Sequence, residues 1–264
     1  MKNEKMSAKR VIHRYVNGVL STVQDEIVTE FPLTIFVNDE EFATMVCTPI
    51  HFEEMVIGFL ASEGVIRFRD DIKTLTIDES RGYAYISLHS KMTTSQQLHS
   101  KRFIGSCCGK SRQFYFHNDA RTAKTSTATT TITPSQCSNL MKQMQDESIV
   151  FQETGGVHNA ALCTPVELIV SRTDIGRHNA LDKLYGHSLI NRIPVRDKVI
   201  VFSGRISSEV LLKAAKIGVG IVLSKSAPTD LALKLAEDLN ITAVGFIRGD
   251  SFNVYSHPER IVQK

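Results

Sequence analysis

The chain has 264 residues, of which 42% are hydrophobic and 22% are charged, a composition typical of a soluble globular protein with a substantial core. Its net charge of +3 comes without a dense stripe of Lys and Arg, which argues against a nucleic-acid partner. The charged N-terminal segment is not followed by an apolar run, and the longest apolar stretches are shorter than a membrane span. We therefore expect a cytoplasmic protein with neither a secretory signal nor a membrane partner.

The first half of the chain is predicted to be rich in strands. Residues 11–46 contain the β-rich runs "LTIFVN" and "EFATMVC", joined by a turn at "NDEE". Residues 48–66 predict a helix, with Thr48 as its N-cap and Pro49 in its first position. Apolar residues repeat there at helical spacing and form one face: Phe52, Met55, Val56, Phe59 and Leu60. "KTLTID" and "YAYISL" predict a further strand pair around "ESRG".

The stretch 103–111 reads "FIGSCCGKS", and its adjacent cysteines are two of only five in the chain. An odd number of cysteines without a signal peptide predicts reduced thiols. Lys110 and Arg112 would favour the thiolate of Cys107 or Cys108, which indicates a nucleophile or a sulfur-carrying thiol on a glycine-flanked loop at about 104–111. The alternative is a small buried side chain. Structural zinc is not favoured, because no second ligand pair stands at a suitable distance.

A Thr-rich stretch follows, and we expect it to be a linker at 121–134. It would separate a strand-rich part, residues 1–120, from an α/β domain, residues 135–264. A short helix opened by Pro134 is predicted at 134–147.

The second half alternates between strands and helices. The predicted strands are "VELIVS", "KVIVFSG", "GIVLS" and "ITAVGF", and the predicted helices are "GRHNALDKLYGHSLI", "SSEVLLKAAKIG" and "TDLALKLAEDLN". Apolar strands spaced by amphipathic helices predict a parallel sheet covered on both faces. Ligands bind beyond the C-terminal ends of such strands, which directs attention to "SRTDIGRH", "SGRISSE", "SKSAPTD" and "FIRGDS".

Two histidines stand in segments dense in polar residues. His158 follows Gly155-Gly156 in "TGGVHNAAL" and could be an acid, a base or a thiolate partner, or equally a hydrogen-bonded core histidine. His178 lies four residues before Asp182 in "DIGRHNALDK", so that this carboxylate could orient its imidazole.

The same segment offers other polar groups. Asp174 could cap a helix that begins near Gly176, and Asn179 and Lys183 have the spacing of a second helical pair. Arg177 would lie at the helix N-terminus, where phosphate binds well. The alternative is an exposed helix with local salt links.

Two later turns could bind an anion or a nucleotide. Arg205, Ser207 and Ser208 of "FSGRISSE" could offer hydroxyls and backbone N–H groups, or serine could simply cap the next helix. In "GFIRGDSF", Asp250 could accept hydrogen bonds from a purine or a ribose beside Arg248, or the segment could be an exposed polar turn.

Together, "GSCCGKS", "TGGVHNAAL", "DIGRHNALDK", "SGRISSE" and "GFIRGDSFNVYSHPERI" resemble the FdhD family of sulfur-carrier proteins, over nearly the whole chain. The resemblance implies a sulfurtransferase that takes persulfide sulfur from a cysteine desulfurase. It would pass this sulfur to the molybdenum cofactor, bis-molybdopterin guanine dinucleotide, before the cofactor enters formate dehydrogenase. It also implies a three-layer fold like that of cytidine deaminases in the C-terminal half. The deaminase zinc signature, H-x-E together with P-C-x-x-C, is absent, so no metal is expected.

The resemblance assigns roles to particular residues. Cys107 matches the family's persulfide carrier, and Cys108 matches the second cysteine if two residues are deleted from the usual C-x-x-C. The expected cofactor-binding residues are Phe246, Ile247, Arg248, Gly249, Asp250 and Ser251, with help from Arg205, Ser207 and Arg177. His158 or His178 would move a proton. The alternatives are a cofactor-binding chaperone that moves no sulfur and an unrelated thiol hydrolase. The oligomeric state is open, with a homodimer as one option.

Overall fold

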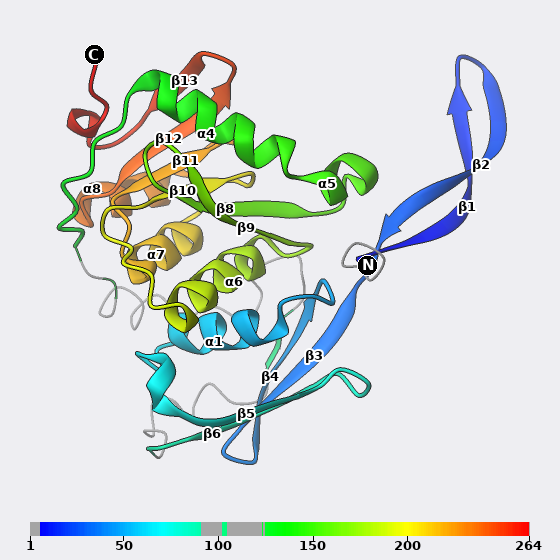
Figure 1. Ribbon diagram of the computed structural model, residues 1–264. Helices are drawn as coiled ribbons and strands as arrows, with labels where there is room; N and C mark the ends of the chain where they lie inside the picture. The colour runs from blue at the N-terminus through cyan, green and yellow to red at the C-terminus, as the bar shows by residue number, and fades with distance from the viewer. Residues whose placement is uncertain (1–5, 91–101, 105–122, 124, 264) are drawn as a thin grey trace.

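The computed structural model describes residues 6–90, 102–104, 123 and 125–263. The strands form a two-stranded ribbon, a five-stranded sheet and a six-stranded sheet. Helices lie between the two larger sheets and on the outer face of the larger one (Figure 1). The expected mixed α/β architecture is confirmed. No helix among the described residues is long and apolar enough to span a lipid bilayer.

The N-terminal ribbon consists of β1 (Ser7–Val16) and β2 (Val19–Val28), which pair antiparallel along their whole length. Asn17 and Gly18 join them, both with positive φ, 49° and 87°. A two-residue Asn-Gly turn of this kind matches the right-handed twist of the flanking strands. The ribbon projects from the rest of the molecule (Figure 1).

The five-stranded sheet has the order β5-β6-β3-β4-β7. Its strands are β3 (Phe31–Val37), β4 (Glu40–Cys47), β5 (Ile72–Asp78), β6 (Tyr83–Leu88) and β7 (Arg102–Ile104). Helix α1 (Phe52–Ser62) covers one face and is followed by the 3-10 turn η2 (Arg69–Asp71). All five residues of the predicted apolar face of α1 are buried, which confirms the helix and the strand pairs predicted in this part.

The predicted start of α1 is wrong. The N-cap is His51 in a left-handed conformation, and the helix begins at Phe52 rather than at Pro49. Thr48 is instead fully buried, and its hydroxyl and N–H both contact Asp174, 126 residues later in the chain. Thr48 therefore binds a residue distant in the sequence instead of capping α1, and local sequence spacing cannot reveal such a partner.

The six-stranded sheet has the order β13-β12-β11-β10-β8-β9. Its strands are β8 (His158–Cys163), β9 (Leu168–Asp174), β10 (Val199–Phe202), β11 (Ile221–Ser224), β12 (Thr242–Arg248) and β13 (Ser251–Val254). The four predicted strands β9 to β12 all run in the same direction, but only β10, β11 and β12 pair parallel with one another. β8 and β13, which the sequence did not reveal, run antiparallel to their neighbours, so the sheet is mixed rather than parallel. The connections β8–β9 and β12–β13 are too short for the crossover that parallel pairing requires.

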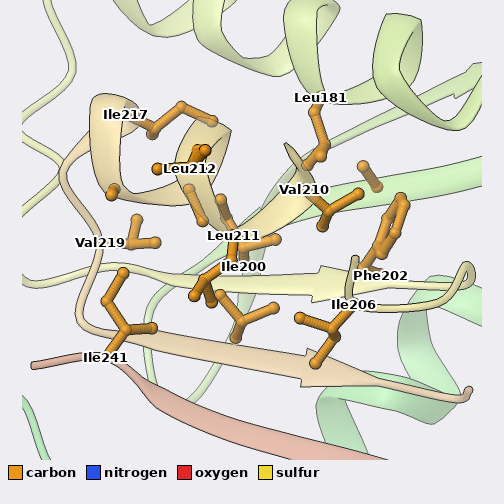
Figure 2. Packing of buried hydrophobic residues seen from close by; sticks show 14 of the residues in the cluster. Leu181, Ile200, Phe202, Ile206, Val210, Leu211, Leu212, Ile217, Val219 and Ile241 are labelled. Atoms are coloured by element: carbon orange, nitrogen blue, oxygen red, sulfur yellow. The ribbon is translucent and has the colours of Figure 1, made fainter. Parts of the chain in front are cut away.

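Helices cover both faces of this sheet. The helices of this half of the chain are α4 (Pro134–Asp146), α5 (Ile149–Thr154), α6 (Arg177–Ile190), α7 (Ser208–Ile217) and α8 (Asp230–Asp238), with the 3-10 turn η3 (Pro258–Arg260) near the end. Helices α6, α7 and α8 share one apolar cluster with the sheet, and α4 shares another on the opposite face. Figure 2 shows Val210 and Leu211 of α7 packed near Ile200 and Phe202 of β10.

The predicted opening of α4 is confirmed. Pro134 is its first residue, and Thr133 and Gln136 form a capping box before and within it. The described part of the expected linker packs on the larger sheet, since Ile132 bridges to Ile261 and Ser126 donates to the carbonyl of Leu239. The division of the chain into domains stays a prediction.

Helices α1 and α6 join the two sheets through a very close contact. Gly58 of α1 lies against the backbone of Asp182, and Gly186 of α6 lies against the backbone of Glu54. A Cβ atom at either glycine would overlap the opposite backbone, so only glycine allows this approach. The two halves of the chain are thereby packed along one seam.

Candidate functional site

One edge of the six-stranded sheet collects the segments singled out in the sequence. Strands β9 to β12 end there, and β8, which runs antiparallel to both its neighbours, begins there with His158 paired to Asp174. The expectation that the C-terminal strand ends gather these segments is confirmed. The sequence did not reveal β8, whose antiparallel direction brings "TGGVH" to the same edge.

His158 is half-buried at this edge, with Gly204 close to its Nδ1 atom. Burial lowers the pKa of His158 and the nearby charge of Arg177 lowers it further, while Asp174 acts in the opposite direction. The neutral imidazole is therefore favoured around neutral pH, and a neutral imidazole can accept a proton.

The start of α6 supplies Arg177 and His178, but not in the predicted arrangement. Nε2 of His178 lies 3.0 Å from Oε2 of Glu209 on α7, so the prediction that Asp182 orients this ring is wrong. Asp182 instead bonds Ser62 and Lys213, both buried. The competing carboxylate comes from a neighbouring helix, because buried Asp182 points into the α1–α6–α7 seam.

The other helical pair and the cap are also different from those predicted. Gly176 is the N-cap of α6, and buried Asp174 accepts hydrogen bonds from Gly176 N–H at 2.8 Å and from Asn179 Nδ2 at 2.9 Å. Lys183 is fully buried with its Nζ 2.7 Å from Asp174 Oδ2 and 2.7 Å from Thr48 Oγ1. Asn179 also donates to the carbonyl of Val46 at 2.9 Å. This buried network fixes the turn before Arg177 and ties it to the end of β4.

Serine hydroxyls connect the loops that follow the parallel strands. Ser224 donates to the carbonyl of Gly204 at 2.7 Å and accepts from the N–H of Ser226 at 2.9 Å. The carbonyl of Ser226 accepts from the N–H of Phe246 at 3.2 Å. On the other side, Ser203 accepts from the N–H of Asn159 at 2.9 Å. These contacts hold the loops after β10, β11 and β12 in one fixed arrangement, and the sequence did not single out their serines.

The segment "FIRGDS" forms the turn between β12 and β13. Arg248 pairs with Ser251 across the two-residue connection Gly249-Asp250, with φ of 54° at Gly249. All four of these residues are exposed. Their side chains, and the left-handed glycine that turns the chain, are therefore open to a ligand.

Phe246, just before this turn, is strained and exposed. Its φ is 56°, in the left-handed region that bulky side chains rarely adopt, and the residue is 38% exposed. The guanidinium carbon of Arg248 lies 5.9 Å from the ring centroid. Ile247 between them is buried against α4, so only its backbone is available to a ligand. Residues held in sparsely populated backbone conformations cluster at active sites and ligand clamps, so this strain marks Phe246 as a candidate for ligand contact.

The remaining predicted anion-binding residues lie at the start of α7. Arg205 is exposed, and Ser207 is the N-cap of α7, where its Oγ accepts from Val210 N–H at 3.4 Å. The alternative prediction for this serine, that it caps the next helix, is thus confirmed. Its hydroxyl hydrogen remains a donor.

Cys107 and Cys108 lie outside the described residues, but the strand before them is described. β7 runs parallel to β4, with Met45 opposite Ile104. Three residues beyond Met45, β4 is followed by Thr48, which contacts Asp174 at the site edge. β7 is therefore directed toward the edge that carries the candidate site.

The three other cysteines are buried. Cys47, Cys137 and Cys163 are all free thiols with no exposed surface. Burial raises the pKa of the Cys137 and Cys163 thiols to about 12 and that of Cys47 further still. None of the three can form a thiolate readily or reach a partner protein.

Comparison with known proteins identifies the family. The model of the FdhD/NarQ family matches residues 28–262. The chain belongs to the FdhD/NarQ family. A protein of Bacillus subtilis named "Sulfur carrier protein FdhD" is 64% identical over 98% of this chain and 99% of its own length. A Staphylococcus aureus protein of the same name is 59% identical over 98% of each chain.

A solved structure shares the fold. It is described as a putative formate dehydrogenase accessory protein from Desulfotalea psychrophila, with a TM-score of 0.79, 24% identity, and coverage of 97% of this chain and all of the other. At this identity the likeness concerns the fold alone. The resemblance that the sequence motifs indicated is thus confirmed for this FdhD/NarQ protein.

Proposed function

We propose that this protein is a sulfur carrier that accepts persulfide sulfur from a cysteine desulfurase. It passes the sulfur to the molybdenum cofactor, bis-molybdopterin guanine dinucleotide, before that cofactor enters formate dehydrogenase in the cytoplasm. The relatives named as sulfur carriers cover nearly the whole chain. The observation that carries the proposal is the state of the thiols: three of the five cysteines are buried and protonated, which leaves the adjacent pair at 107 and 108.

The loading step is a thiol–persulfide exchange. The Cys107 thiolate attacks the terminal sulfur of the desulfurase persulfide, a new S–S bond forms on Cys107, and the desulfurase cysteine leaves as a thiolate. Lys110 and Arg112 favour the attacking thiolate, and exchange is fastest when its pKa lies near the ambient pH. Cys108 protects or releases the persulfide.

The cofactor is the substrate of the second step, and its guanine nucleotide end suits the exposed turn after β12. The Phe246 ring offers a stacking surface for guanine, and Asp250 can accept hydrogen bonds from N–H groups of the base. Arg248 can bind the diphosphate, with Ser251 and the N–H groups around Gly249 nearby. Arg177, Arg205 and Ser207, at the starts of α6 and α7, add charge and a hydroxyl for the same anion.

The direction of β7 supports a meeting of sulfur and cofactor. Cys107 follows Ile104 by three residues, a reach of at most about 10 Å. Since β7 points toward the edge with His158 and Arg177, we propose that transfer occurs there. His158 accepts a proton during transfer, and His178, paired with Glu209, is the second candidate. The layering of α4, the six-stranded sheet and α6–α8 is the basis for proposing a cytidine-deaminase-like arrangement.

Labelled sulfur tests the carrier assignment. The protein is incubated with desulfurase and ³⁵S-cysteine, and bound sulfur is located by mass spectrometry. Cys107→Ser should lose the label and fail to support formate dehydrogenase, while Cys137→Ser, a matched change at a buried thiol, should keep both. Full labelling and activity in Cys107→Ser would refute the assignment. Activity retained in the Cys107→Ser/Cys108→Ser double variant would favour a chaperone that moves no sulfur, and turnover of simple nucleotides without desulfurase would favour a hydrolase.

Guanosine diphosphate tests the cofactor turn separately. Arg248→Ala should weaken its binding about tenfold, the usual loss when a charged hydrogen-bond partner is removed. Arg81→Ala is the matched control, because Arg81 is exposed in the turn after β5, on the other sheet. Equal affinity in wild type and Arg248→Ala by calorimetry would remove this turn from the site.

A further inference from the structure

The carboxylate of Asp174, at the end of β9, is completely buried and accepts hydrogen bonds from both halves of the chain. Its Oδ1 atom accepts from Gly176 N–H at 2.8 Å and from Asn179 Nδ2 at 2.9 Å. Its Oδ2 atom accepts from the N–H and the hydroxyl of Thr48, both at 3.0 Å, and from Lys183 Nζ at 2.7 Å. One oxygen therefore holds the turn that opens α6, and the other holds the residue that follows β4.

Stability alone does not account for this pair of charges. Two ions lose their hydration when they are buried, and apolar residues of similar volume often stabilise a fold equally well. Asp182, the neighbour of Lys183 on α6, forms a second buried pair with Lys213 of α7 and also bonds Ser62 of α1. That pair lies in the seam of the three helices, whereas Asp174 lies at the sheet edge that carries the candidate site.

Asp174 also contacts the segments that the proposed transfer uses. It is the cross-strand partner of His158, at the edge where β8 begins. The turn that it holds leads directly into Arg177, the first residue of α6. Asn179, which is bonded to Asp174, donates to the carbonyl of Val46 on β4 at 2.9 Å. β4 in turn pairs with β7, the strand that precedes the adjacent cysteines.

We propose that Asp174, with Lys183 as its counter-ion, is a positioning residue for sulfur transfer and holds the end of β4, the turn at Arg177 and His158 in one fixed arrangement. This inference rests on the proposed function and adds to it two residues that are fully buried and so touch neither sulfur nor cofactor. Reacting groups displaced by about 1 Å can lose about 100-fold in rate, so a fixed sheet edge would speed the transfer.

The charge of Asp174 has a second effect, on the proton of His158. Burial lowers the pKa of His158 and the charge of Arg177 lowers it further, whereas the charge of Asp174 raises it. The loop after β10 places the uncharged Gly204 next to the Nδ1 atom of the ring. Removal of the Asp174 charge should therefore lower the pKa of His158 further, because the protonated ring loses an anion that stabilises it.

Two matched double variants separate positioning from stability. Asp174→Asn/Lys183→Met removes both charges of the proposed pair, so that neither ion is left buried without its partner. Asp182→Asn/Lys213→Met makes the same two changes to the pair in the helix seam. Urea unfolding measures the stability of both variants. If Asp174 only stabilised the fold, the two variants would behave alike in the two assays that follow.

NMR titration of the histidine signals measures the pKa of His158 without any sulfur donor. His158→Gln identifies the signal of this residue among the nine histidines of the chain. The pKa should be lower in Asp174→Asn/Lys183→Met than in wild type, and it should keep its wild-type value in Asp182→Asn/Lys213→Met. An unchanged pKa in the first variant, or an equal fall in both, would overturn the inference.

Sulfur delivery measures the positioning effect itself. Each protein is loaded with ³⁵S from desulfurase, and the loaded protein is then assayed for activation of formate dehydrogenase. Both variants should accept label, but delivery by Asp174→Asn/Lys183→Met should be about tenfold slower than by Asp182→Asn/Lys213→Met. Equal delivery by the two variants would overturn the inference. A wild type that accepts no label would instead refute the proposed carrier function, and the NMR comparison would still decide whether Asp174 acts on His158.

Discussion

Two polar groups of residues lie near the same sheet edge in very different surroundings. The network of Thr48, Asp174 and Lys183 is completely buried, and the side chains of Thr48 and Lys183 lie 2.7 to 3.0 Å from each other and from Asp174. The turn from Arg248 to Ser251 is exposed on all its residues. The polar motifs of the sequence therefore have two different structural roles in this protein. The buried members hold the two halves of the chain together, and the exposed members are free to meet a ligand.

Replacement of Lys183 by Met should break the buried group and have the largest effect. It leaves Asp174 charged and uncompensated in the interior, which typically costs about 3–5 kcal/mol of the free energy of unfolding. Lys234→Met is the matched control, because Lys234 pairs with Asp230 at 2.8 Å but both side chains are more than two-thirds exposed. Exposed pairs contribute about 1 kcal/mol or less. Equal urea midpoints for the two variants would contradict the structural role of the network.

A partner substitution sharpens the same point. Adding Asp174→Asn to Lys183→Met removes the isolated charge, so the double variant should regain part of the lost stability. A double variant with a lower free energy of unfolding than Lys183→Met would show that charge compensation is not what stabilises the network.

The next largest effect on stability is expected at the close contact of α1 and α6. Gly186→Ala should lower the free energy of unfolding by about 2–3 kcal/mol, since overpacking forces the two helices apart. The added Cβ would overlap the backbone of Glu54. Urea unfolding measures the change, with Lys234→Ala, at an exposed position of α8, as a control for a new alanine in a helix. A stabilised Gly186→Ala, as helix propensity alone predicts, would show that the helices can separate freely.

These two contacts also show what sequence patterns can and cannot reveal. The strand at 41–47 and the helix at 207–218 were predictable because their apolar spacing is local. Thr48, Asp182 and Asn179 were misassigned because local spacing suggested partners within one helix. Their real partners are 31 to 135 residues away: Lys183 for Thr48, Lys213 for Asp182 and Val46 for Asn179. Such pairing depends on the tertiary fold.

The candidate site was easier to predict than the sheet that carries it. The segments containing Arg177, Arg205 and Arg248 were expected at the strand ends and lie there, because the four predicted strands β9 to β12 run in the same direction. The presence and direction of β8 and β13 were not predicted, since a short apolar run has the same pattern whichever way the strand points. The motif at His158 lies at the site only because β8 runs antiparallel to its neighbours.

On the exposed side of the comparison, Phe246→Gly should separate binding from stability. Glycine adopts the left-handed conformation without strain, so the free energy of unfolding should rise by up to about 1 kcal/mol. Guanosine diphosphate binding should weaken about tenfold, because base stacking is worth about 1–3 kcal/mol. Calorimetry and urea unfolding on the same sample measure both changes. A variant that is less stable and binds normally would assign Phe246 to packing instead.

The smallest effect concerns His158, which is between the two groups in burial. Its pKa is lowered in the folded protein by burial and by Arg177, so below the ordinary value of 6.5 the unfolded chain binds more protons than the folded one. The stability that the neutral ring contributes is therefore fully present above pH 6.5 and is lost as the pH falls toward the lowered value. His158→Gln should remove this part of the pH dependence of urea unfolding between pH 8 and 5. If the free energies of unfolding of wild type and variant change in parallel over that pH range, the pKa of His158 is the same in the folded and unfolded states. Its proposed role as a neutral proton acceptor would then be refuted.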